Sequence, residues 1–84
     1  MKLYTVLIDD RYTDPQILLF STYEKAMTAI KDYLSDFEES IKQVDPLDVT
    51  MSEDLLIKHN LLFYVCYSTE GNNIRMRKVK VDAV

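Results

Sequence analysis

The spacing of apolar residues changes twice along this chain, and this change restricts the fold more than any other feature. Residues 21–44 place apolar side chains three and four positions apart, which is the repeat of an α-helix with one buried face. Short runs rich in β-branched and aromatic residues lie before and after that segment, and such runs are typical of strands. The resulting order of strand, strand, helix, strand, strand favours one sheet with its helices on one face.

The first two strands are predicted over KLYTVLI, residues 2–8, and QILLFS, residues 16–21. Residues 9–15, DDRYTDP, join them. Hairpin loops usually contain about two to five residues, so this longer loop is expected to project from the sheet.

The helical repeat predicts a long helix from about residue 22 to residue 43. Ser21 and Glu24 have the spacing of a capping box at its start. The helix is expected to end before Pro46, because the preceding residue, Asp45, is pushed away from helical backbone angles.

A second, shorter helix is predicted from about residue 51 to residue 59. Thr50 and Glu53 would form its capping box, and Asn60 would end it. An extended loop is the alternative for this segment.

The last third of the chain reads as a hairpin. Residues 61–69, LLFYVCYST, are apolar on both faces, which predicts a central strand. Residues 70–73, EGNN, supply a turn in which glycine and asparagine adopt positive φ. In the closing strand, 74–82, the apolar positions change parity at Arg77-Lys78, which predicts a β-bulge there.

The predicted fold class is α+β with the order ββα(α)ββ, as a single domain over residues 1–84. It consists of one four-stranded, largely antiparallel sheet with one long and one short helix on one face. Two helices cannot cover apolar residues on both faces of four strands. The other face is therefore either solvated or covered by a second copy, and we expect a homodimer or a higher homo-oligomer.

The chain has features of a cytoplasmic protein. It contains one cysteine, Cys66, so an internal disulfide is excluded, which favours a reducing compartment. Its N-terminus lacks the apolar region of a signal peptide. No apolar run approaches the ~20 residues that span a bilayer, so no membrane partner is expected.

The composition argues against an enzyme, a cofactor or a metal site. With one glycine, the chain has no glycine-rich phosphate loop, and one cysteine with one histidine cannot complete a tetrahedral zinc site. Cys66 is interpreted as a small core residue and His59 as a helix-terminal residue. No catalytic residue and no metal ligand is predicted.

The loop DDRYTDP has two interpretations. In the first, its aspartates bond local backbone and Arg11 pairs with a neighbouring acid. In the second, Arg11, Tyr12 and Asp14 recognise a partner, because Arg and Tyr are the residues that most often anchor interfaces.

The segment LYTVLIDDRYTDPQILLFSTYEKAMTAIKDY, within residues 1–35, resembles the start of short accessory proteins encoded by phages and prophages. In those proteins a strand ending in Asp-Arg-(His or Tyr)-x-Asp leads to a second strand, then a helix and a closing hairpin. Here Tyr12 follows the arginine, which removes a titratable group from the motif. The resemblance implies a small accessory gene concerned with the host or its defences, and a location in the host cytoplasm. It assigns no functional residue.

The closing strand carries four cations, Arg75, Arg77, Lys78 and Lys80. If the bulge forms, they share one face as a row that can hold phosphates. The alternative is an edge strand protected by charge. The chain as a whole is acidic, with a net charge of −4, which argues against long nucleic acids and leaves a small anionic nucleotide ligand.

The middle of the chain, residues 21–60, carries four lysines and nine acids. These acids either form an ordinary solvated helix face or imitate a row of phosphates. The sequence does not decide whether this acidic surface or the basic strand is the working surface.

Three functions remain as hypotheses. The first is a non-enzymatic protein that binds a host protein, most simply a defence protein, and inhibits or modulates it. The second is an oligomeric binder that sequesters a nucleotide-type signal. The third is a structural or assembly component. We favour the first because the chain is small, lacks catalytic groups and has more tyrosines than its core requires.

Overall fold

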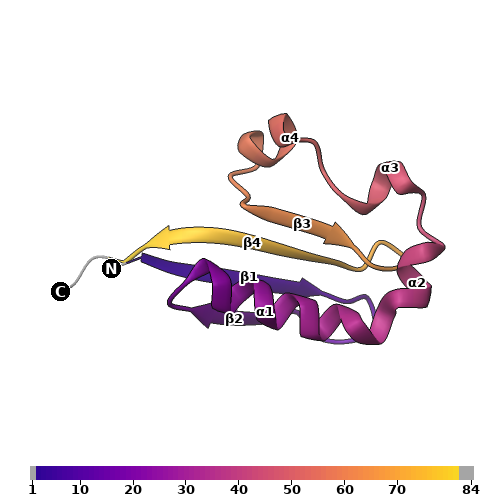
Figure 1. Ribbon diagram of the computed structural model, residues 1–84, viewed down its shortest axis with the longest axis horizontal. Coiled ribbons are helices and arrows are strands. Elements are labelled where there is room, and N and C mark those ends of the chain that lie inside the picture. The colour runs from indigo at the N-terminus through magenta and orange to yellow at the C-terminus, as the bar shows by residue number, and fades with distance from the viewer. Residues whose placement is uncertain (1, 82–84) are drawn as a thin grey trace.

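The computed structural model describes residues 2–81 and shows four antiparallel strands in one sheet (Figure 1). The strand order is β2-β1-β4-β3. The strands are β1 (Lys2–Asp9), β2 (Gln16–Phe20), β3 (Phe63–Cys66) and β4 (Asn73–Lys80). The predicted α+β class and the ββα(α)ββ order are confirmed.

The predicted long helix is present but interrupted. It consists of α1 (Tyr23–Leu34), the 3-10 turn η1 (Ser35–Phe37) and α2 (Glu38–Lys42). At the interruption, the Ser35 hydroxyl donates to the Asp32 carbonyl at 2.6 Å. Such local side-chain bonds compete with the regular helical pattern.

Two short helices follow, α3 (Pro46–Val49) and α4 (Glu53–Lys58). The Asp45 carboxylate accepts a hydrogen bond from the N–H of Leu47 at 3.0 Å, and Pro46 occupies the first turn of α3. The Asp-Pro pair therefore starts a new helix, which the sequence had not predicted. The predicted end at Asn60 is confirmed, because this residue has a φ of 56° just after α4. No helix within residues 2–81 is long and apolar enough to cross a bilayer.

Both predicted capping boxes were displaced along the chain. Helix α1 is capped by Thr22, whose hydroxyl accepts from a first-turn N–H at 3.1 Å, rather than by Ser21. Helix α4 is capped by Ser52 rather than by Thr50. Serine and threonine can both cap a helix, and the residue that adopts extended backbone angles where the helix begins becomes the cap.

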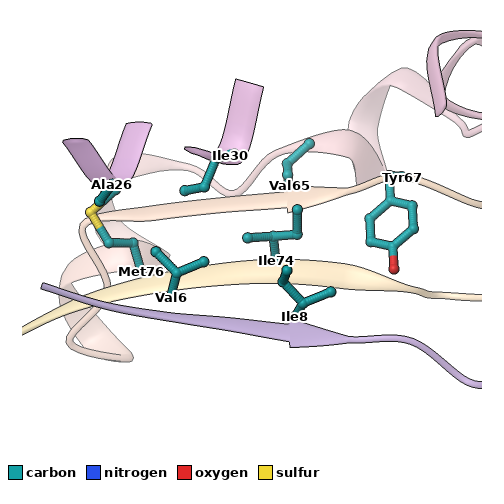
Figure 2. Close-up of a cluster of buried hydrophobic side chains, with 8 residues drawn as sticks. All are labelled: Val6, Ile8, Ala26, Ile30, Val65, Tyr67, Ile74 and Met76. Carbon is teal, nitrogen blue, oxygen red and sulfur yellow. The ribbon is translucent and has the colours of Figure 1, made fainter. Parts of the chain in front are cut away.

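Helix α1 covers one face of the sheet and forms the core with it. Ala26 and Ile30 of α1 are completely or almost completely buried against side chains of the sheet. Figure 2 shows this cluster, with the remaining members coming from the strands and from the residue after β3: Val6, Ile8, Val65, Tyr67, Ile74 and Met76. Alternate residues of a strand point to opposite faces, so the register fixes which side chains reach this core.

The prediction that residues 61–69 form a central strand was wrong. β3 has four residues and lies at the edge of the sheet, whereas β1 and β4 are central. Residues on both sides of β3 are apolar for two reasons. Val65 packs in the core with residues of α1, and the strand is also in contact with α3. Apolar character on two faces therefore did not require two neighbouring strands.

The predicted β-bulge was also wrong. β4 pairs with β1 without interruption from Lys80 opposite Lys2 to Asn73 opposite Asp9. The last three residues of β4 are exposed. Lys78 and Lys80 therefore occupy positions on the helix side that are apolar earlier in the strand. The change in apolar pattern at Arg77-Lys78 comes from this loss of burial. Asp82, at the end of the predicted strand, lies outside the described residues.

Candidate functional site

Asp10 holds the loop between β1 and β2 against the core. One carboxylate oxygen accepts a hydrogen bond from the hydroxyl of Tyr67 at 3.0 Å, and the other accepts from the N–H of Tyr12 at 2.9 Å. The Tyr67 hydroxyl is also 3.4 Å from that of Tyr33. The interpretation that an aspartate bonds local backbone is confirmed for Asp10, and the same carboxylate makes a second bond to a buried group.

Tyr67 is completely buried and lies beside two rings of the helical segment, those of Tyr33 and Phe37. Burial, followed by the hydrogen bonds with Tyr33 and Asp10, raises the pKa of the Tyr67 phenol above its ordinary value of 10.0. A phenol that stays neutral and packed in this way fastens the loop to the core.

The same loop also meets the turn between β3 and β4. The N–H of Arg11 donates to the side-chain oxygen of Asn72 at 2.9 Å, and the hydroxyl of Tyr12 donates to the Glu70 carboxylate. The bond to Glu70 is the main cause that raises the pKa of the Tyr12 phenol. The loop is thus attached at several points, although Tyr12 remains 71% exposed.

The three loop residues predicted to recognise a partner are all exposed. Within residues 2–81, the Arg11 side chain forms no ion pair, so the expected pairing with a neighbouring acid is not observed. The structure therefore leaves the guanidinium of Arg11 and the carboxylate of Asp14 in solvent at one end of the sheet.

The sheet face opposite α1, here called the open face, carries a different set of side chains. Its members follow from the register and the alternation of each strand. They are Leu3, Thr5, Leu7 and Asp9 of β1; Ile17 and Leu19 of β2; Tyr64 and Cys66 of β3; and Asn73, Arg75, Arg77 and Val79 of β4.

Cross-strand pairs arrange the centre of the open face in two rows. In the first, Leu7 lies between Ile17 and Arg75, and Arg75 is followed by Tyr64. Neighbouring strands are about 4.8 Å apart, so this row spans roughly 14 Å. In the second row, Thr5 separates Leu19 from Arg77.

Several apolar side chains of the open face are exposed to solvent. Ile17 is 68% exposed and Leu19 is 61% exposed, while Val79 is 40% exposed. Exposed apolar side chains that lie together usually mark an interaction surface. The half-buried Arg75 and Arg77 lie two strands away from Ile17 and Leu19, across Leu7 and Thr5 of β1, so the face combines apolar area with two cations.

Arg75 is partly oriented by its own strand. Its Nε donates to the side-chain oxygen of Asn73 at 3.0 Å, and the Asn73 amide in turn donates to the carbonyl of Gly71 at 2.9 Å. Gly71 has a φ of 88°, which glycine adopts without strain, so the turn beside this chain of bonds depends on it. Preorganisation lowers the entropy lost when the guanidinium binds an acid.

The predicted row of four cations does not exist on one face. Arg75 and Arg77 belong to the open face, whereas Lys78 and Lys80 point to the side of the sheet that carries α1. Lys78 pairs across the sheet with Tyr4. The hypothesis of a continuous phosphate-holding row depended on the bulge and loses its geometric basis with it.

A cavity of about 400 Å³ lies beside β3. It is lined by Val44, Asp45, Asp48, Tyr64, Cys66, Ser68, Thr69 and Gly71. The two aspartates make it unfavourable for a phosphate-bearing ligand. Cys66 is 6% exposed and its thiol donates to the Ser68 carbonyl, which confirms its interpretation as a buried structural residue.

Another group of exposed apolar side chains lies in the segment that contains α3 and α4: Leu47, Leu55, Ile57 and Leu62. None of these four side chains lines the cavity beside β3. His59 lies at the end of α4, as predicted.

Sequence reasoning missed the two most exposed apolar side chains of the open face, those of Ile17 and Leu19. The signal was the run QILLF, which is apolar at successive positions and therefore on both faces of β2. It also missed the bond between Asp10 and Tyr67, because nothing in the chain indicates that these distant residues meet.

Searches for related proteins among known families, curated proteins and solved structures found no match.

Proposed function

We propose that this protein is a small, non-enzymatic accessory protein that binds a host protein and inhibits or modulates it, with host defence as the setting. One observation carries the binding role: the open face presents exposed apolar side chains beside Arg75, Arg77 and Tyr64. The setting is supported by the resemblance of residues 1–35 to phage-encoded accessory proteins.

The residue types on the open face fit a protein partner. Aromatic residues and arginine are enriched in interfaces, whereas lysine and glutamate are depleted. The open face contains two arginines and one tyrosine, and no member of it is a lysine or a glutamate. The lysines of β4 lie on the other face.

The charges of the open face also indicate the kind of partner. Asp9, at one end, is the only carboxylate among its strand residues, and Asp45 and Asp48 line the cavity beside Tyr64. Within residues 2–81, no ion pair of Arg75 or Arg77 is found. A guanidinium can hold a partner's carboxylate with two parallel hydrogen bonds. We infer a partner surface with an apolar centre flanked by aspartate or glutamate.

Charge reversal on β4 tests this proposal with a matched control on the same strand. The test variant is Arg75→Glu with Arg77→Glu, and the control is Lys78→Glu with Lys80→Glu. Each protein is immobilised and exposed to bacterial lysate, and the retained proteins are identified by mass spectrometry. We expect a partner that the wild type and the control retain, and that the test variant loses by about tenfold or more.

The proposal fails if no protein shows this pattern, or if the lysine variant loses the partner as well. Circular dichroism of both variants checks that the fold is intact. The competing nucleotide hypothesis has a separate readout, thermal shift with a nucleotide panel. It would replace the present proposal if a nucleotide stabilised the wild type and the control but not the test variant.

A further inference from the structure

We propose that β2 pairs with β2 of a second copy of this chain, so that two four-stranded sheets join edge to edge into one continuous antiparallel sheet. This interaction lies beside the open face and does not depend on the proposed function.

β2 is an unprotected edge strand. The strand order leaves β2 and β3 at the two edges. Within Gln16–Phe20 there is no charge and no proline, and three consecutive residues are substantially exposed: Ile17, Leu18 and Leu19. Edge strands of soluble proteins usually carry lysine, proline or a bulge that prevents pairing with another chain. None of these devices occurs in β2.

The opposite edge is less accessible. β3 has four residues, and α3 contacts it. In Figure 1, α3 and α4 lie on the far side of β3, whereas β2 forms the other edge of the sheet and is crossed by α1 in this view. The chain therefore shields one edge and leaves the backbone donors and acceptors of the other available for a ladder.

The sequence of β2 is complementary to itself. When two copies pair antiparallel with Leu18 opposite Leu18, Ile17 of each copy lies opposite Leu19 of the other. Gln16 then lies opposite Phe20. No like charges meet, and directly opposed apolar pairs stabilise a sheet. A two-fold axis through this point gives the isologous contact typical of homodimers.

Charge favours edge pairing over contact between two open faces. A face-to-face dimer would bring Arg75 and Arg77 of both copies together, with Asp9 as the only acid among the strand residues of each face. Burying cations without partners is strongly unfavourable. Edge pairing leaves the half-buried Arg75 and Arg77 uncovered by the second copy. It places the four side chains of Ile17 and Leu19 between the two arginine pairs, so it enlarges the open face.

The experiment is native mass spectrometry of the full-length protein and three variants. The wild type is expected at twice the 9.9 kDa chain mass. Ile17→Lys with Leu19→Lys places lysines opposite each other across the axis and is expected to be monomeric. Ile17→Lys with Leu19→Glu places opposite charges there and is expected to restore the dimer. Val79→Lys, on the same face but on a central strand, is expected to remain dimeric.

A monomeric wild type overturns the proposal, and so does a dimer that persists in the double-lysine variant. If that variant fails to fold, the decision comes from cross-linking. Under mild oxidation, Leu18→Cys is expected to give a covalent dimer and Val79→Cys is not, with buried Cys66 present in both. The absence of a Leu18→Cys cross-link then overturns the proposal. Arg75→Glu with Arg77→Glu should stay dimeric, so loss of a partner and loss of the dimer are distinguished.

Discussion

At the scale of single residues, Asp10 and Tyr67 determine where the loop between β1 and β2 lies. The carboxylate accepts hydrogen bonds from a buried hydroxyl and from a backbone N–H, so it satisfies two donors at once. Asp14, in the same loop, is exposed, and no hydrogen bond of its side chain is found within residues 2–81. Of these two acids in one short loop, Asp10 therefore has a structural role, whereas the Asp14 carboxylate is exposed to solvent.

Replacing Asp10 should therefore destabilise the fold. Asp10→Ala leaves the buried Tyr67 hydroxyl with Tyr33 alone, and we expect a loss of about 1–3 kcal/mol in the free energy of unfolding. Asp14→Ala is the matched control and should change this quantity by less than about 0.5 kcal/mol. Urea denaturation measures both. Equal effects of the two substitutions would contradict the role given to Asp10.

The raised pKa of Tyr67 predicts a dependence of stability on alkaline pH. In the folded protein the phenol stays protonated above its ordinary pKa of 10.0, whereas in the unfolded chain it ionises near that value. The unfolded state then binds fewer protons, so the contribution of Tyr67 to stability is constant below about pH 10 and falls as pH rises above it. Chemical denaturation at several pH values should show a smaller alkaline loss for Tyr67→Phe. If stability falls equally steeply with alkaline pH in Tyr67→Phe, Tyr67 does not cause the alkaline loss.

At the scale of secondary-structure elements, hydroxyl side chains determine where helices begin. Thr22 caps α1, although Ser21 precedes it and has the same chemistry. The Ser21 hydroxyl instead accepts from the Lys25 ammonium at 3.4 Å, an exposed contact. Such contacts contribute little, whereas an unsatisfied N–H at a helix start is costly.

The two substitutions Thr22→Ala and Ser21→Ala separate these roles. Thr22→Ala should lower the free energy of unfolding by about 1 kcal/mol, within the range known for helix caps. Ser21→Ala should change it by less than about 0.5 kcal/mol. Thermal unfolding followed by circular dichroism gives both values. A larger effect at Ser21 would show that Ser21 is the cap, as the sequence had predicted.

At the scale of the whole molecule, stability comes from one face of the sheet and recognition is proposed for the other. The core joins α1 to β1, β3 and β4. Helix α4 contributes no buried residue. A small protein with a one-sided core has little stability to spare, so substitutions should differ sharply according to the side on which they lie.

Two isoleucines test this division. Ile30 of α1 is 1% exposed, and Ile57 of α4 is 71% exposed. Ile30→Ala should lower the free energy of unfolding by about 2–5 kcal/mol, because it leaves a cavity in the core. Ile57→Ala should change it by less than about 0.5 kcal/mol. Denaturant titration measures both values, and a comparable loss at Ile57 would mean that α4 also belongs to the core.

The sequence alone predicted the four strands, the long helical segment and α4 in their order, although it missed α3, because the apolar period is a local property that neighbouring residues define. It also predicted the end of α4 at Asn60 and the structural character of Cys66. Among the candidate binding residues, it grouped Arg75 and Arg77 with Lys78 and Lys80, from which the unbroken register separates them.

Only the tertiary structure decided the strand order, the caps and the uncovered surfaces. Burial depends on which distant segments meet. The sequence of a strand shows that a side chain is apolar, but it does not show which segment covers that side chain. For this reason β3 was predicted to be central but lies at an edge, and the exposure of Ile17 and Leu19 was not predicted. The open face and the free edge of β2 exist because one helix covers one side of the sheet and the α3 segment contacts the opposite edge.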